Sequence, residues 1–311
     1  MPTQDASFDS QVTSSHLDTR THLACDIGSN AMRILLGRAV SNGRQIWVQK
    51  QSLLRLPVRL GDDVFSTGNI SAEKIERLIE VCELIHSLAR IYDVASVQVC
   101  ATSAVRESAN VQQVIDVLSR KGRIKLEVID GDVEASLVQL VVQHLHLDDL
   151  VKNQLFIDVG GGSTELVYFA GDKLQTRHSF RIGTVRAMLG KVTRNEWQQL
   201  EYWLAQERPK IEELAVVGTG GTINTMSKIA GALDKFLPLA ALDAFIQEAG
   251  SMTPEARQMR WDMRADKADV IVHGCGIYSR ILHLLGVDQI IVPRVGVADA
   301  LVLKAAMGVV I

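Results

Sequence analysis

The alternation of apolar and polar residues predicts that the chain opens with three strands and a long helix. Apolar segments of strand length lie at 23–28, 32–40 and 45–56, with glycine or polar turns between them. From Ser71 to Tyr92 the apolar residues recur at helical spacing, and Ser71 is placed to cap that helix. The pattern continues with a strand at 96–104, a helix at 110–122, a strand at 125–131 and an apolar helix opened by Glu134.

The second half of the chain repeats this order of elements. Asp26-Ile27-Gly28 follows one apolar strand and precedes another, and Asp158-Val159-Gly160 does the same 132 positions later. A duplication of this length is too long for a solenoid repeat and predicts two similar α/β domains. Helices at 195–215 and 254–286, and a strand, glycine loop and helix over 215–231, complete the second domain.

The polar segments between these elements suggest where the domains begin and end. Residues 1–21 are polar and can bury little apolar surface, so we expect a disordered tail. A second polar stretch near 147–152 suggests a boundary between a first domain at 22–148 and a second at 149–311.

Composition narrows the class of protein. Hydrophobic residues make up 47% and charged residues 22% of the 311 residues, which is typical of a globular protein with a sizeable core. The net charge of −3 offers no general attraction for nucleic acid or an anionic membrane, so we expect neither as a partner. The four cysteines are widely spaced and no apolar run reaches 18 residues. We therefore expect a cytoplasmic protein without disulfides or a zinc site.

Three glycine-rich turns follow predicted strands and are the first candidate binding elements. Successive amide groups in such turns can cradle phosphate, and glycine lets a ligand approach the backbone. A tight hairpin turn is the alternative for each of them. Neither the P-loop signature nor the dinucleotide-binding signature is present, which argues against both of those classes. The candidate phosphate ligands in these turns are Gly28, Ser29, Asn30, Gly161, Gly162, Ser163, Thr164, Gly220, Gly221 and Thr222.

The repeated Asp-x-Gly turn also suggests a metal. An aspartate at the end of a buried strand, beside amides that hold phosphate, can bind Mg²⁺. Glu165 follows Asp158 by seven positions on the returning strand, so both carboxylates could reach one ion. We therefore take Asp26, Asp158 and Glu165 as candidate ligands of Mg²⁺ or Mn²⁺, against the alternatives of a turn-forming Asp and a solvated Glu.

Several motifs in order along residues 23–303 resemble one family. They are CDIGSNAMRIL (25–35), VRLGDDV (58–64), ATSAVRESAN (101–110), VIDGDVEASL (128–137), FIDVGGGSTEL (156–166), SFRIGTVR (179–186), VGTGGTIN (217–224) and RADKADVIV (264–272). Together they resemble the exopolyphosphatase and guanosine pentaphosphate phosphohydrolase family, within the superfamily of actin, Hsp70 and sugar kinases. The resemblance implies two ribonuclease-H-like domains, of the actin-like ATPase type, flanking an interdomain cleft. It also implies a last helix that packs back on the first domain.

The resemblance further implies a reaction and roles for particular residues. Hydrolysis of a terminal phosphoanhydride needs charge neutralisation and an oriented water. Arg33, Arg106 and Arg181 are the candidate cations, because a guanidinium can pair two phosphate oxygens. Glu134, in the motif Gly131-Asp132-Val133-Glu134-Ala135, matches the glutamate that activates water in the family. Departures from the family pattern stand at Ala31, Ser136 and Ala298.

These observations leave several functions open. The leading one is an exopolyphosphatase that releases orthophosphate from inorganic polyphosphate. A guanosine pentaphosphate phosphohydrolase is close behind. A sugar-kinase-like phosphotransferase and a non-catalytic module that senses polyphosphate or nucleotide are alternatives from other classes. A homodimer is compatible with the resemblance but does not follow from the residues.

Overall fold

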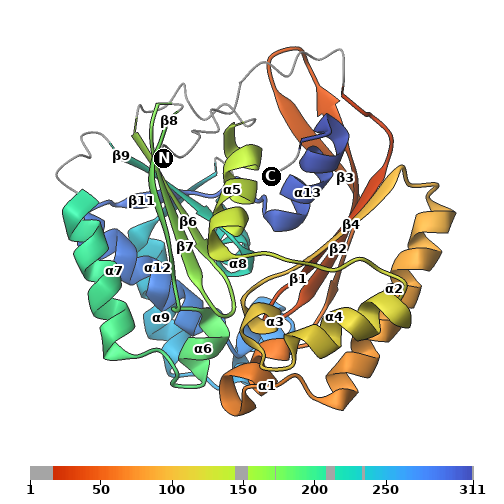
Figure 1. The fold of residues 1–311 in the computed structure, drawn as a ribbon. Helices are drawn as coiled ribbons and strands as arrows, with labels where there is room; N and C mark the ends of the chain where they lie inside the picture. The colour runs from red at the N-terminus through yellow and green to blue at the C-terminus, as the bar shows by residue number, and fades with distance from the viewer. Residues whose placement is uncertain (1–16, 144–152, 172, 208–213, 233–234, 310–311) are drawn as a thin grey trace, which may run out of the picture.

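Two sheets with helices around them make up the computed structural model of this protein (Figure 1). The structure describes residues 17–143, 153–171, 173–207, 214–232 and 235–309. The predicted domain boundary near residue 148 and the first 16 residues of the expected tail lie outside them.

The first sheet has five strands in the order β3-β2-β1-β4-β5. The three opening strands predicted from the sequence are antiparallel neighbours, whereas β1, β4 and β5 run parallel. The strands are β1 (His22–Ile27), β2 (Met32–Ser41), β3 (Ile46–Leu56), β4 (Ser96–Ala101) and β5 (Glu127–Val128). The helices of this half are α1 (Leu60–Thr67), α2 (Ala72–Ile91), α3 (Ser103–Glu107), α4 (Val111–Arg120) and α5 (Gly131–Gln143). Ser71 caps α2 as predicted, because its side chain accepts a hydrogen bond from the Lys74 amide.

The second sheet has six strands in the order β10-β11-β9-β6-β7-β8. They are β6 (Asn153–Val159), β7 (Thr164–Ala170), β8 (Lys173–Phe180), β9 (Leu214–Thr219), β10 (Phe236–Pro238) and β11 (Gln289–Ile291). The helices are α6 (Thr184–Met188), α7 (Arg194–Glu207), α8 (Gly221–Ile229), α9 (Leu239–Gly250), α10 (Pro254–Trp261), α11 (Ala265–Ala268), α12 (Ile271–Leu285) and α13 (Val297–Met307).

The two sheets confirm the duplication. In each, an antiparallel meander of three strands is followed by two strands added parallel to its first strand, so β8-β7-β6-β9-β11 repeats β3-β2-β1-β4-β5. This is the predicted pair of ribonuclease-H-like domains. Two separate cores cover the outer faces of the sheets: one around α2 and α4, the other around α9 and α12.

A third core joins the two halves. It contains apolar residues of β1 and β2, of β6 and β7, and of the helices α5 and α13 (Figure 1). Helix α5 packs against β7 and β8 of the second sheet, and α13 packs against β1 and β2 of the first. Each helix therefore lies against the sheet of the other half.

Several local expectations differ from the structure. The strand expected at 96–104 ends at Ala101 and is followed by α3, and the strand expected at 125–131 covers only Glu127–Val128. Residues 17–21 contact the body of the protein, since Leu17 packs on the third core and the Asp18 amide donates to the Ala306 carbonyl. The helical segment expected at 254–286 is divided into three helices, and the first division follows because Asp262 takes a left-handed conformation (φ 46°) that ends α10. The helix expected at 195–215 ends at Glu207 among the described residues, and residues 214 and 215 already belong to β9.

Among the residues that the structure describes, no helix combines the length and the apolar character needed to cross a bilayer.

Candidate active site

The parallel strands of the two sheets end near one another, and the candidate site is built at those ends. Strand β1 leads into the turn of Gly28, β4 leads into α3, and β5 leads into α5 (Figure 1). In the other half, β6 and β9 lead into the remaining glycine turns. Ligands in open α/β sheets bind outside the carboxyl ends of such strands.

The first two glycine turns press against each other across the two halves. A Cβ on Gly161 would lie 2.7 Å from the Ser29 Cβ, and one on Gly162 would lie 2.4 Å from the Ser103 Oγ. Only glycine leaves room for this approach. Ser29 is itself held by a 2.9 Å hydrogen bond between its hydroxyl and that of Ser103. The two turns are thus brought together as the sequence suggests.

The third glycine turn reaches the same place. A Cβ on Gly220 would lie 2.6 Å from Asp158 Oδ1, and Gly220 has a φ of 98°. Its neighbour Gly221 lies beside two cations, since a Cβ there would be 3.0 Å from Lys267 Nζ and 3.1 Å from Arg33 Nη2. Close approach to charged side chains explains why glycines occupy this turn.

Asp158 and Glu165 stand side by side on one hairpin. They are register partners between the antiparallel strands β6 and β7, so their side chains share a face of the sheet. Both are buried. Ser179 on β8 donates from its hydroxyl to Glu165 Oε1 at 2.9 Å and orients that carboxylate. The pairing predicted from seven-residue spacing is therefore present.

Glu134 projects from the first turn of α5 into the same region. The Asp130 side chain accepts from the Val133 amide at 2.8 Å and caps the start of this helix. A Cβ on Gly131 would lie 2.5 Å from the Ser179 Cβ, so the start of α5 packs directly on β8. The carboxylate of Glu134 is buried, and the oxygens Glu134 Oε2 and Glu165 Oε2 have no hydrogen-bond partner among the described residues.

Burial and mutual repulsion shift the pKa values of these carboxyl groups upward. Burial, and then Glu165 and Asp158, raise the pKa of Glu134 well above its ordinary value. Burial raises the pKa of Asp158 to about 6, although Arg33 opposes the shift. Burial and the charge of Asp158 raise the pKa of Glu165 to about 7. If all of these carboxyl groups were ionised, the cluster would carry more negative charge than its surroundings stabilise.

Cations border this cluster from both halves. Arg33 donates to Asp26 Oδ2 at 2.8 Å, and Arg106 donates to the Ile129 carbonyl at 2.6 Å. The charge of Arg106 opposes the rise in the pKa values of Glu134 and Glu165 but does not cancel it. Lys267 is buried, and burial together with Arg55 and Arg33 lowers its pKa to about 7.

Three residues that were predicted to bind phosphate contact other protein groups in the structure. The side chain of Arg181 is 63% exposed and pairs with Glu107. The Thr164 hydroxyl donates to the Ile182 carbonyl, and Thr222 packs against Gly274 of α12. Asn30, by contrast, bridges the halves, since its side-chain amide donates to the Asp266 carbonyl at 3.1 Å, while its buried Oδ1 has no partner in the part of the chain that the structure describes.

Sequence reasoning missed Lys267 and the ion pairs that join the halves. Lys267 lies within a motif, RADKADVIV, whose charged residues gave no sign of which would turn inward. Arg186 pairs with Glu107 at 2.7 Å and stacks over Phe65, while Arg55 pairs with Asp266 and Arg59 with Asp269. Each of these pairs connects residues far apart in the chain, so spacing could not reveal them.

The carboxylate oxygens of this cluster fit a divalent cation that keeps several water ligands better than one enclosed entirely by protein ligands. Within the described ranges, no three His, Cys, Asp or Glu side chains are arranged to enclose a metal ion. Mg²⁺ keeps several waters and needs one or two carboxylates together with substrate phosphates. The adjacent Asp158 and Glu165, with the buried unpaired oxygen of Glu165, match that requirement.

The two similar α/β halves make up a two-domain fold of the actin-like type. A crystal structure described as an exopolyphosphatase from Cytophaga hutchinsonii superimposes with a TM-score of 0.79 at 21% identity, over 94% of this chain and 99% of that one. The sequence profile of the Ppx/GppA phosphatase family matches residues 49–307. The chain belongs to this family.

Relatives within the family differ in length. A bifunctional 3-dehydroquinate synthase/phosphatase of Fusobacterium nucleatum is 25% identical over 301 residues, which cover 86% of this chain and 44% of the relative. A guanosine-5'-triphosphate,3'-diphosphate pyrophosphatase of Aliivibrio fischeri is 23% identical over 283 residues, covering 86% of this chain and 56% of the relative. The chain therefore spans about half the length of these two proteins.

Proposed function

We propose that this protein hydrolyses terminal phosphoanhydride bonds, with inorganic polyphosphate as its leading substrate and guanosine pentaphosphate as the alternative. The observation that carries the proposal is the position of Glu134. Its buried carboxylate lies among Asp26, Asp158 and Glu165, where glycine turns of both halves meet. The family membership supports the same reaction class. The four cysteines are free thiols, which suits a cytoplasmic location.

In the proposed mechanism, the chain neutralises and positions the terminal phosphate. Arg33, Arg106 and Lys267 offset its charge, while backbone amides of the glycine turns donate hydrogen bonds to its oxygens. Asp158 and Glu165, with Asp26 nearby, would hold Mg²⁺ or Mn²⁺, which supplies further charge neutralisation when bound. Glu134 accepts a proton from the attacking water as the water oxygen bonds to phosphorus. The bond between phosphorus and the bridging oxygen breaks, and this oxygen stays on the shortened chain. Orthophosphate and the shortened chain are the two products.

Phosphate release from polyphosphates of graded length and from guanosine pentaphosphate tests this proposal. We expect release that requires Mg²⁺ and stops with a chelator, and a higher kcat/KM for polyphosphate. A higher kcat/KM for guanosine pentaphosphate would reverse the order of the two substrates. Tight polyphosphate binding without phosphate release at any metal concentration would select a sensing module instead, and turnover only with an organic acceptor would select a phosphotransferase.

The proposed metal site predicts a pH-dependent stabilisation by Mg²⁺. In the metal-free protein the pKa of Glu165 is raised from 4.5 to about 7, so the native state binds more protons than the unfolded state in this range. Stability therefore falls as the pH rises through this window. Mg²⁺ should offset that loss, with a gain in unfolding free energy on the order of 1–3 kcal/mol near pH 7.5 and much less near pH 5.

Thermal unfolding with and without Mg²⁺ measures this effect. Asp158→Asn removes one proposed ligand, so its stability should respond less to Mg²⁺ near pH 7.5. An exposed acid serves as the matched control: Asp116→Asn on α4 should respond like the original protein. Equal stabilisation at both pH values, or an unchanged response in Asp158→Asn, would contradict the assignment of the metal.

A further inference from the structure

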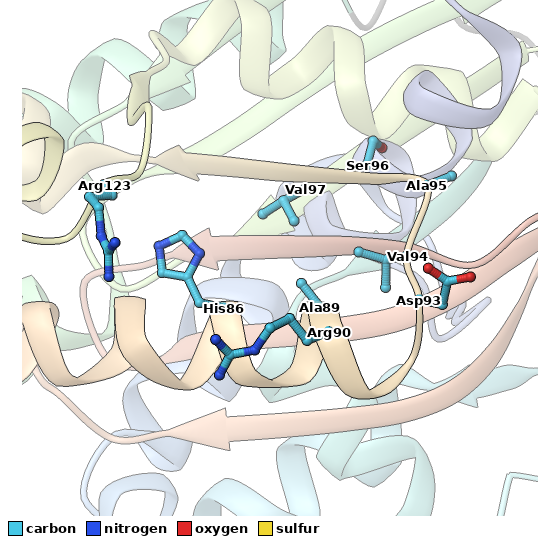
Figure 2. Close-up of a pocket in the computed structure, with 9 residues that line it drawn as sticks. All are labelled: His86, Ala89, Arg90, Asp93, Val94, Ala95, Ser96, Val97 and Arg123. Carbon is cyan, nitrogen blue, oxygen red and sulfur yellow. The ribbon is translucent and has the colours of Figure 1, made fainter.

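A groove of about 570 Å³ lies on the first half, where α2 ends and β4 begins (Figure 2). Its volume falls within the range of small-molecule sites. Its walls come from the last two turns of α2, from the connection that leads into β4 and from Arg123 after α4. Strand β4 leads from this groove at Ser96 to Ala101 near the proposed active site, a span of about 17 Å. The groove is therefore separate from that site.

One end of the groove gathers basic side chains. Figure 2 shows Arg123, His86 and Arg90 at the same end, with the guanidinium of Arg90 extended toward His86. Arg90 and Arg123 make no side-chain hydrogen bond or ion pair with any described residue, in contrast to their neighbours Arg120, paired with Asp116, and Lys121, paired with Glu76. Two guanidinium groups without counter-charges leave their donors free for an anion.

His86 completes this end. Its Nε2 lies 2.8 Å from the Gly122 carbonyl, which can only accept, so Nε2 carries the proton and fixes the ring. The other ring nitrogen, Nδ1, has no partner among the described residues. The imidazole is therefore held in place between the two arginines.

The rest of the groove has a different character. Ala89, Val94 and Val97 give it an apolar middle, and Val97 is 38% exposed although it lies in a strand. Asp93 stands at the end opposite Arg123 (Figure 2), and its carboxylate makes no hydrogen bond with a described residue. The carboxylate interacts electrostatically with Arg20, but the guanidinium of Arg20 is already held by Asp18.

We propose that this groove is a second ligand site, which binds a nucleoside polyphosphate. The phosphates lie on Arg90 and Arg123 at the end of the groove that His86 borders, the base packs on the apolar middle, and an amino or hydroxyl group of the nucleoside donates to Asp93. An inorganic polyphosphate would satisfy the basic end but would meet apolar carbon in the middle and a like charge at Asp93. The sequence of cation, apolar surface and carboxylate thus favours the nucleotide.

Amide hydrogen exchange locates binding at the groove independently of the active site. All proteins carry Glu134→Gln so that the probes, GTP and inorganic tripolyphosphate, are not consumed. GTP should protect peptides covering residues 86–97 and 120–126, and its concentration dependence gives a Kd. In Arg90→Ala/Arg123→Ala this Kd should rise at least about tenfold, because two charge-assisted hydrogen-bonding groups are lost.

Matched controls separate a built site from a general electrostatic effect. Arg120→Ala/Lys121→Ala removes the same charge from the same region but not from the groove, and its Kd should stay within about twofold. Asp93→Ala should weaken GTP binding while leaving tripolyphosphate unchanged or tighter. All four arginine and lysine side chains are exposed, so unfolding temperatures should be preserved in these variants.

Three outcomes would overturn the proposal. If GTP did not protect residues 86–97 from exchange, the groove would not be a binding site. If both double variants weakened GTP binding equally, the general positive charge of this surface would explain the binding. Tripolyphosphate binding as tightly as GTP, without discrimination by Asp93→Ala, would exclude a nucleoside ligand. None of these outcomes depends on whether the proposed hydrolysis is correct, since none is read from activity.

Discussion

Glu134→Gln is expected to lower kcat for phosphate release by about 10²–10⁴-fold while the protein keeps its fold. Glutamine has the shape of glutamate but cannot accept a proton from water. Because burial and neighbouring carboxylates raise the pKa of Glu134, the neutral amide resembles the protonated form favoured in the metal-free protein. The unfolding temperature without metal should therefore be equal or higher.

Steady-state phosphate release and thermal unfolding together check this expectation. Asp132→Asn is the matched control, because Asp132 lies in the same helical turn but is exposed and contacts Arg177. That variant should retain turnover within about threefold, as surface substitutions usually have small effects. Comparable turnover in Glu134→Gln and Asp132→Asn would remove Glu134 from the reaction.

Gly183→Ala is expected to damage both stability and activity. A Cβ at this position would lie 2.4 Å from the Gly162 carbonyl carbon and 2.5 Å from that of Gly161, so backbone must move. The amides of Thr184, Val185 and Arg186 bind the carbonyls of Gly160 and Gly161 and would move with it. We expect a loss of about 1–3 kcal/mol in unfolding free energy and on the order of 10²-fold in kcat/KM.

Gly276→Ala is the control for this substitution. Gly276 lies inside α12, and no heavy atom of another described residue lies within 4 Å of a Cβ placed there. Alanine favours a helix by about 1 kcal/mol over glycine, so this variant should be as stable as the original or more so. If both alanine variants behaved alike, the tight packing of α6 on the glycine turn would have no functional consequence.

The order of elements along the chain and the duplicated turn could be predicted because they depend on local pattern. The apolar alternation of 23–28 and 32–40 reflects burial that the sheet requires, and Asp26 and Asp158 occupy equivalent turns in the two halves. The pairing of Asp158 with Glu165 followed from hairpin spacing alone. Such features depend on residues that are close together in the sequence, and they are present in the structure.

The rest could not be predicted because it depends on contacts between distant segments. The sequence does not distinguish Arg181 from Arg106 as a phosphate ligand. In the structure, Arg181 forms an ion pair with Glu107 at the surface, whereas Arg106 lies close enough to Glu134 to affect its pKa. Burial of Lys267 depends on where α11 meets the glycine turn of Gly221. The first division within 254–286 depends on the backbone conformation of Asp262, a residue type that tolerates left-handed geometry without requiring it.

The position of α13 has a consequence for biosynthesis. Residues 297–307 cover the face of β1 and β2, strands that leave the ribosome more than 250 residues earlier. During translation, Ala24 and Leu35 on that face lack the helix that buries them in the finished molecule. The amino-terminal half therefore stays partly uncovered until residues 297–307 have been made, and a chaperone could bind it during this period.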